Sequence, residues 1–181
     1  QLALPLGAAA MVSLLYCAYL YFSQQEDPAQ GTEEFENPFE LAPALGFGCM
    51  RLPILDGDSA RIDEPEATRI VRHAIDHGVN YLDTAYGYHH GNSERFLGRA
   101  LQDGYRERVH LATKLPSWLV KTSDDFDRLL NEQLGKLQTD HIDFYLLHGL
   151  GAARWRELDK LGVLPWAESA IADGRIRHLG F

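Results

Sequence analysis

The 181-residue sequence is poor in cysteine and in basic residues, and both shortages narrow the classes of protein it can belong to. Only Cys17 and Cys49 occur, in different sequence surroundings, so a disulfide framework is excluded and a reducing compartment is expected. The 17 lysines and arginines face 26 acidic residues, which gives a net charge of −9 without any basic cluster. Such a chain is a poor candidate for nucleic-acid binding, and we expect no nucleic-acid partner.

No lysine or arginine precedes Arg51, and the segment before residue 44 divides into an apolar part and an acidic part. Residues 2–22 carry no charge, and about 20 apolar residues suffice to cross a bilayer as a helix. We therefore predict an N-terminal transmembrane helix within 1–22 and an acidic linker over 23–43. This predicts a cytoplasmic protein that associates with the membrane through 2–22. The open alternative is that 1–43 is a wrong gene start or an unrelated fused piece.

From residue 44 onward, short apolar runs alternate with segments of helical periodicity. We predict strands at 44–49, 79–82, 109–113, 142–147 and 176–181, with helices over 67–76, 93–101, 126–137 and 155–172. Strict alternation indicates a parallel sheet with helical crossovers, either doubly wound or a β/α barrel. A complete eight-stranded barrel usually needs about 250 residues, so a barrel here would be truncated after strand five.

Capping residues support the limits of three predicted helices. Asp63 precedes the first helix and Gly78 follows it, Ser93 is a candidate N-cap of the second, and Thr122 with Asp125 resembles a capping box before the third. These short-range signals predict where the connecting loops begin, and therefore which residues stand at the ends of the strands.

Titratable side chains follow three successive predicted strands at their carboxyl ends. Asp83 follows the strand at 79–82 and Tyr88 lies five residues later, while Lys114 and His148 end the next two strands. The carboxyl ends of parallel strands meet at one edge of the sheet, where binding and catalytic sites are built. We therefore expect these four side chains to lie close together.

The four residue types suit proton transfer to an oxygen atom of a substrate. A phenol such as Tyr88 releases its proton reluctantly at neutral pH, and a nearby ammonium group stabilises the phenolate. Asp83 would keep Lys114 charged in a closed site, and His148 would donate a hydrogen bond to a carbonyl oxygen that gains negative charge. The pattern offers no metal site and no activated nucleophile.

Five segments resemble motifs of the aldo-keto reductase family and occur in the family's order. They are LGFGCMRLP (45–53), VNYLDTAYGYHHGNSERFLGRAL (79–101), LATKLP (111–116), TDHIDFYLLHGL (139–150) and GRIRHLGF (174–181). The resemblance covers 44–181 and implies an α/β fold, the N-terminal half of a (β/α)8 TIM barrel. It also implies an NADP-dependent oxidoreductase, with NAD as the other cofactor considered, that reduces a small-molecule aldehyde or ketone by hydride transfer.

The resemblance assigns roles to individual residues as well. It implies a catalytic tetrad of Asp83, Tyr88, Lys114 and His148, with Tyr88 as the general acid. It places the cofactor near four residues: Gly48, Cys49, Met50 and Asp83. Tyr88, His148 and Trp118 are the expected substrate-binding residues, although loop packing remains an equal alternative for Trp118. No metal ligand is assigned.

The residues of the motifs most resemble those of a bacterial subgroup whose members often carry a C-terminal ferredoxin-like iron–sulfur part. The sequence holds no cysteine cluster for it, so an iron–sulfur cluster is expected only with a further C-terminal part. In the family, later loops make most contacts with the cofactor phosphates, so we expect this chain alone to bind NADP weakly. Two alternatives stay open, namely a non-catalytic nucleotide-sensing module of a membrane assembly and an inactive truncated fragment.

Overall fold

The computed structural model of the protein describes residues 45–181. The strands and α-helices follow one another along the chain as β1 (Phe47–Gly48), α3 (Glu64–Asp76), β2 (Tyr81–Asp83), α4 (Asn92–Ala100), β3 (His110–Pro116), α5 (Asp124–Leu137), β4 (Ile142–His148), α6 (Ala152–Lys160), α7 (Val163–Ala172) and β5 (Ile176–Gly180). Short 3₁₀ turns lie between them at η1 (Cys49–Arg51), η2 (Tyr88–Gly91), η3 (Arg106–Arg108) and η4 (Ser117–Leu119).

The predicted membrane helix within 1–22 and the acidic linker at 23–43 lie outside the described residues. Within 45–181, no helix is both long enough and apolar enough to cross a bilayer. The described part of the chain therefore gives the membrane-association prediction no support.

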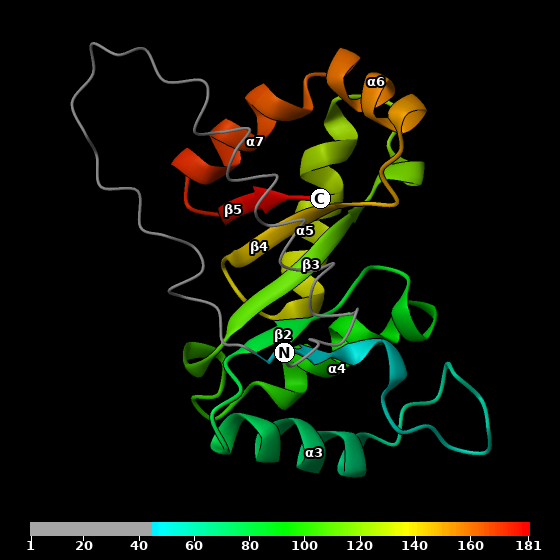
Figure 1. Ribbon diagram of the computed structural model, residues 1–181, viewed down its shortest axis with the longest axis vertical. Helices are drawn as coiled ribbons and strands as arrows, with labels where there is room; N and C mark the ends of the chain where they lie inside the picture. The colour runs from blue at the N-terminus through cyan, green and yellow to red at the C-terminus, as the bar shows by residue number, and fades with distance from the viewer. Residues whose placement is uncertain (1–44) are drawn as a thin grey trace, which may run out of the picture.

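The order of strands in the sheet decides between the two architectures that periodicity left open. All four neighbouring pairs are parallel, and the order is β1-β2-β3-β4-β5. A doubly wound sheet reverses its strand order at a switch point, whereas a barrel adds each strand beside the preceding one. Figure 1 shows α5 behind β3 and β4, with α4 near β2 and α7 near β5. The arrangement is that of the first five strands of a barrel with the helical connections between them, as predicted.

The main hydrophobic core lies between the sheet and the helices. Its largest fully buried side chains are Tyr145, Phe96, Phe126, Leu82, Leu97, Leu111, Leu115, Leu129, Leu130, Leu137, Ile142 and Leu158. Burial of one such side chain stabilises the fold by about 1.5–3 kcal/mol. A smaller buried cluster of Tyr81, Ala112 and Phe144 is separate from this core. Because side chains alternate along a strand, the face of Tyr81 and Ala112 also carries Asp83 and Lys114.

Of the three capping predictions, the one for the first helix is confirmed and the one for the third helix is confirmed in part. The Asp63 side chain accepts a hydrogen bond from the Glu66 amide at 3.3 Å, and Gly78, with φ of 97°, follows the end of α3. Before α5, Asp125 Oδ2 accepts from the Thr122 amide at 2.9 Å, which is one half of the predicted capping box. Both signals are local in sequence, which is why they could be predicted.

Three predicted elements differ from the structure. Ser93 is not an N-cap, because α4 begins after Gly91 and the buried Ser93 hydroxyl donates to the Cys49 carbonyl at 3.2 Å. The helix predicted over 155–172 is two helices, α6 and α7, separated at Gly162, where φ is 81°. The strand predicted at 44–49 pairs only at Phe47–Gly48, since the chain turns into η1 directly afterwards.

Candidate active site

The register of the sheet brings the predicted strand-end residues to one edge. Gly48 is the partner of Asp83 across β1 and β2, and His148 is the partner of Pro116 across β3 and β4. Lys114 lies two residues before Pro116 on β3. The ends of β1 and β2 are level with Ala112 of β3, while β3 and β4 extend together as far as Pro116 and His148. Asp83, Lys114 and His148 therefore lie in the same carboxyl-terminal part of the sheet.

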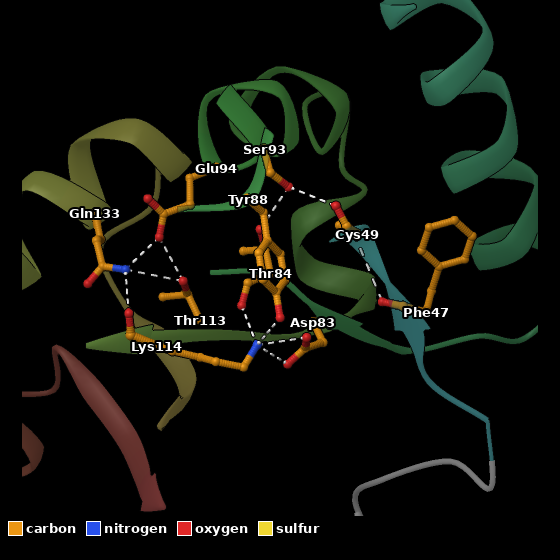
Figure 2. Close-up of polar contacts among 10 residues, drawn as sticks. All are labelled: Phe47, Cys49, Asp83, Thr84, Tyr88, Ser93, Glu94, Thr113, Lys114 and Gln133. Atoms are coloured by element: carbon orange, nitrogen blue, oxygen red, sulfur yellow. Dashed lines mark hydrogen bonds and ion pairs between the residues drawn. The ribbon is translucent and has the colours of Figure 1, made fainter. Parts of the chain in front are cut away.

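The Lys114 ammonium group is the centre of this region. Its Nζ atom donates to Asp83 Oδ1 at 2.8 Å, to Asp83 Oδ2 at 2.7 Å and to the Thr84 carbonyl at 2.7 Å (Figure 2). Tyr88 Oη lies 3.5 Å from the same nitrogen. The Lys114 and Asp83 side chains are only 13% and 21% exposed, so the pair is poorly screened by water. The Lys114 amino group therefore contacts both the Asp83 carboxylate and the Tyr88 hydroxyl.

His148 lies beside Tyr88 with its ring edge-on, the two ring centroids being 6.2 Å apart. Burial lowers the pKa of His148, and the positive charge of Lys114 lowers it further, so the imidazole is neutral near pH 7. Its Nδ1 atom is buried and has no hydrogen-bond partner within the described part of the chain. Because Nδ1 is buried, Nε2 is the ring nitrogen that could exchange a hydrogen bond with a bound molecule.

Trp118 borders the same region from η4. Its ring meets that of His148 at a centroid distance of 5.2 Å, and 41% of its surface is exposed. The adjacent Ser117 hydroxyl donates to the His148 carbonyl at 2.6 Å, which ties η4 to the end of β4. Trp118 therefore forms an exposed apolar wall next to the imidazole.

Besides Asp83, three residues were predicted to lie near a cofactor, and they differ in what they can contact. Gly48 is exposed, and no atom lies within 4 Å of the position that a side chain would take there. Met50 is 58% exposed, whereas the Cys49 side chain is fully buried in the main core. Burial raises the pKa of the Cys49 thiol far above its ordinary value, and the Asp83 carboxylate adds to the shift. Cys49 can therefore contact a ligand only through its backbone, and it is no nucleophile.

Several polar residues around Lys114 escaped the sequence analysis. Gln133 Nε2 donates to the Lys114 carbonyl at 3.1 Å and also to Glu94 Oε1, which accepts from the Thr113 hydroxyl as well. Ser93 and Glu94 are completely buried on α4. The sequence does contain a signal for them, because polar residues stand among the apolar positions of a predicted helix. A buried polar group requires a hydrogen-bond partner, so such positions indicate a buried polar network. Within 45–181, no group of three or more His, Cys, Asp or Glu side chains is placed to hold a metal ion.

Comparison with known proteins places this geometry in a family. The profile of the Aldo/keto reductase family matches residues 44–181. Methylglyoxal reductase YeaE of Escherichia coli is 32% identical over 138 residues, which is 76% of this chain and 44% of that protein.

Solved structures agree with the sequence match. The holo form of an aldo-keto reductase from Bacillus halodurans has a TM-score of 0.60 and 32% identity, covering 75% of this chain and 45% of that one. An aldo-keto reductase from Klebsiella pneumoniae in complex with NADPH has a TM-score of 0.60 and 30% identity, covering 76% and 44%. This chain thus spans less than half the length of these relatives. With parallel strands in barrel order and a match over 44–181, the chain belongs to the aldo/keto reductase family.

Proposed function

We propose that the chain is the part of an NADP(H)-dependent oxidoreductase that carries the proton-transfer residues for reducing an aldehyde or ketone. The observation that carries this proposal is the Lys114 ammonium group, which both oxygens of Asp83 hold 3.5 Å from the Tyr88 phenol oxygen. Two relatives support the chemistry, since one is a methylglyoxal reductase and another was solved with NADPH.

The residues at the strand edge fit the reactive end of such a cofactor. The space beside Gly48 is open, and the sheet register pairs Gly48 with Asp83, so a flat ring can approach the backbone there. The cofactor ring would contact the backbone of Gly48 and Cys49. The exposed Met50 and the Asp83 carboxylate would contact it as well. A bound dinucleotide supplies the hydride for the carbonyl carbon.

The protein's own residues handle the proton. Tyr88 gives its phenolic proton to the substrate oxygen, and Lys114 stabilises the phenolate that remains. The Asp83 carboxylate accepts from Lys114 Nζ at both oxygens and would balance the lysine's charge in a site that is mostly shielded from water. The neutral His148 donates a second hydrogen bond to the same oxygen, where negative charge develops. Trp118 borders the entrance and packs against the apolar part of the substrate.

The test is reduction of a panel of aldehydes and ketones by the full-length protein with NADPH, followed as loss of reduced cofactor. We expect Tyr88→Phe to lower kcat by about 10²–10⁴-fold, since it removes the acid and keeps the ring. Equal rates for the two proteins would overturn the proposal. Tight NADPH binding without turnover would instead support the nucleotide-sensing alternative.

A further inference from the structure

Two neighbouring histidines follow Tyr88, with the same backbone conformation and different surroundings. His89 and His90 both adopt the left-handed region, with φ of 52° and 55°, which is uncommon for residues other than glycine. His89 is only 8% exposed; its Nδ1 lies 2.8 Å from the Ser59 carbonyl oxygen and its Nε2 3.2 Å from the Leu52 amide nitrogen. His90 is exposed and contacts only the Ser59 hydroxyl, at 3.0 Å, among the hydrogen bonds of the described residues.

The two contacts of His89 determine where its proton lies. The Leu52 N–H group can only donate, so Nε2 accepts, and the Ser59 carbonyl can only accept, so Nδ1 carries the proton. The ring is therefore neutral and joins two separate points of the main chain. Such a buried ring is costly to displace, because both backbone groups would lose their partners.

The backbone that His89 holds borders the candidate active site. Leu52 directly follows η1, the turn that includes Met50. The other end of the turn is held by Ser93, whose hydroxyl donates to the Cys49 carbonyl at 3.2 Å, as Figure 2 shows, and lies 2.9 Å from the Thr84 hydroxyl. One end of the turn is thus tied to His89 in η2 and the other to Ser93 on α4.

We propose that His89 is a positioning residue. It fixes η1 against the Tyr88 segment, and so sets the spacing between the turn at the edge of the site and the phenol. His89 follows Tyr88 directly within η2, so displacement of the imidazole moves the backbone of the phenol as well. The proposal rests on the proposed function, because positioning matters only if Tyr88 and η1 face the same bound molecules.

Two matched variants of the full-length protein test the pair of hydrogen bonds that His89 makes with Ser59 and Leu52, which we call the His89 clamp. His89→Gly and His90→Gly relieve the same left-handed strain, because glycine adopts positive φ freely. Only His89→Gly removes both bonds to the main chain. We expect the Leu52 amide to exchange its hydrogen about tenfold faster in His89→Gly and no more than about twofold faster in His90→Gly.

Two further variants test the two hydrogen bonds of the His89 clamp separately. Glutamine places an acceptor near the position of Nε2 and can keep the Leu52 amide protected. Asparagine places a donor near the position of Nδ1 and can keep only the bond to Ser59. We therefore expect slow Leu52 exchange in His89→Gln and fast exchange in His89→Asn.

The catalytic readout is kcat, together with the deuterium isotope effect measured with NADPH deuterated at the transferred position. We expect His89→Gly to lower kcat about tenfold with KM changed less than about threefold, and to raise the isotope effect. Partial unfolding would lower the rate but leave the isotope effect unchanged.

Equal Leu52 exchange in the two glycine variants would overturn the inference. So would an unchanged kcat and isotope effect in a His89→Gly protein that has lost Leu52 protection. If the wild-type protein reduces no carbonyl yet shows Leu52 protection that depends on His89, the proposed function fails and the clamp is supported.

Discussion

Two lysine–carboxylate groups lie on opposite faces of β3, and they differ in access to solvent. Lys114 pairs with Asp83 at the strand edge. On the helix side, Lys136 Nζ lies 2.6 Å from Glu132 Oε1 and 3.7 Å from Glu94 Oε2. The Lys136 side chain is 6% exposed and that of Glu94 is fully buried.

Within the helix-side group, the buried Glu94 carboxylate has neutral hydrogen-bond partners. The Thr113 hydroxyl donates to Glu94 at 2.7 Å, and Gln133 both donates to Glu94 and accepts from the Tyr145 phenol at 2.6 Å. Burial raises the pKa of Glu94, while the hydrogen bonds from Gln133 and Thr113 oppose the rise. Such a network of partnered buried polar groups stabilises one packing arrangement.

The strand-edge group uses the same residue types differently. Lys114 contacts a phenol, and the neighbouring Trp118 is exposed, so a small molecule can reach the region. The alternation of side chains places Thr113 and Lys114 on opposite faces of one strand. The exposure of each lysine and of its more buried carboxylate, rather than residue type, separates the two groups: Lys114 and Asp83 are 13% and 21% exposed, whereas Lys136 and Glu94 are 6% and 0% exposed.

Removing the strand-edge cation should give the largest effect. We expect Lys114→Met to lower kcat/KM by about 10²–10⁴-fold, because nothing then stabilises the Tyr88 phenolate. Initial rates with NADPH and a reactive aldehyde measure this, with the exposed Lys121→Met as the matched control. Comparable activity in the two variants would contradict the assignment of Lys114.

Removing the helix-side cation should affect stability instead. We expect Lys136→Met to lower the free energy of unfolding by about 3 kcal/mol, because Glu94 stays buried without its cation. In the double variant, Glu94→Gln should restore about half of this loss, since the amide oxygen still accepts from Thr113. Urea unfolding measures both effects. If Lys136→Met lowered kcat/KM and left the free energy of unfolding unchanged, the distinction between the two groups would be removed.

The smallest expected effect is a dependence of stability on pH. Because the pKa of Glu94 is raised in the folded protein, the folded state binds this proton more tightly than the unfolded state. The stabilisation from the protonated carboxyl is fully present below the ordinary glutamate pKa of about 4.3 and is lost as pH rises through the raised value. Glu94→Gln should remove this dependence in unfolding curves recorded across the range. An unchanged dependence would show that another group is responsible.

Periodicity predicted much of this protein, because the signals are local. Alternating apolar runs placed the strands, and Asp63 and Gly78 marked the limits of α3. The same reasoning failed where a contact with a residue distant in sequence determines the role of a side chain. Ser93, for example, donates a hydrogen bond to the Cys49 carbonyl instead of capping α4. The reasoning also failed at Gly162, where one positive φ separates two helices that a continuous apolar pattern had joined.

The sequence by itself determined the order of strands and helices, the residues at the strand ends and the family motifs that contain them. These follow from short-range periods of two and 3.6 residues and from side chains adjacent to them. Only the tertiary structure decided that the strands are ordered as in a barrel and that the Leu52 amide donates to His89. It alone also showed that Gln133 donates to both the Lys114 carbonyl and Glu94. Those features depend on contacts between residues about 20 to 40 positions apart, which no local period encodes.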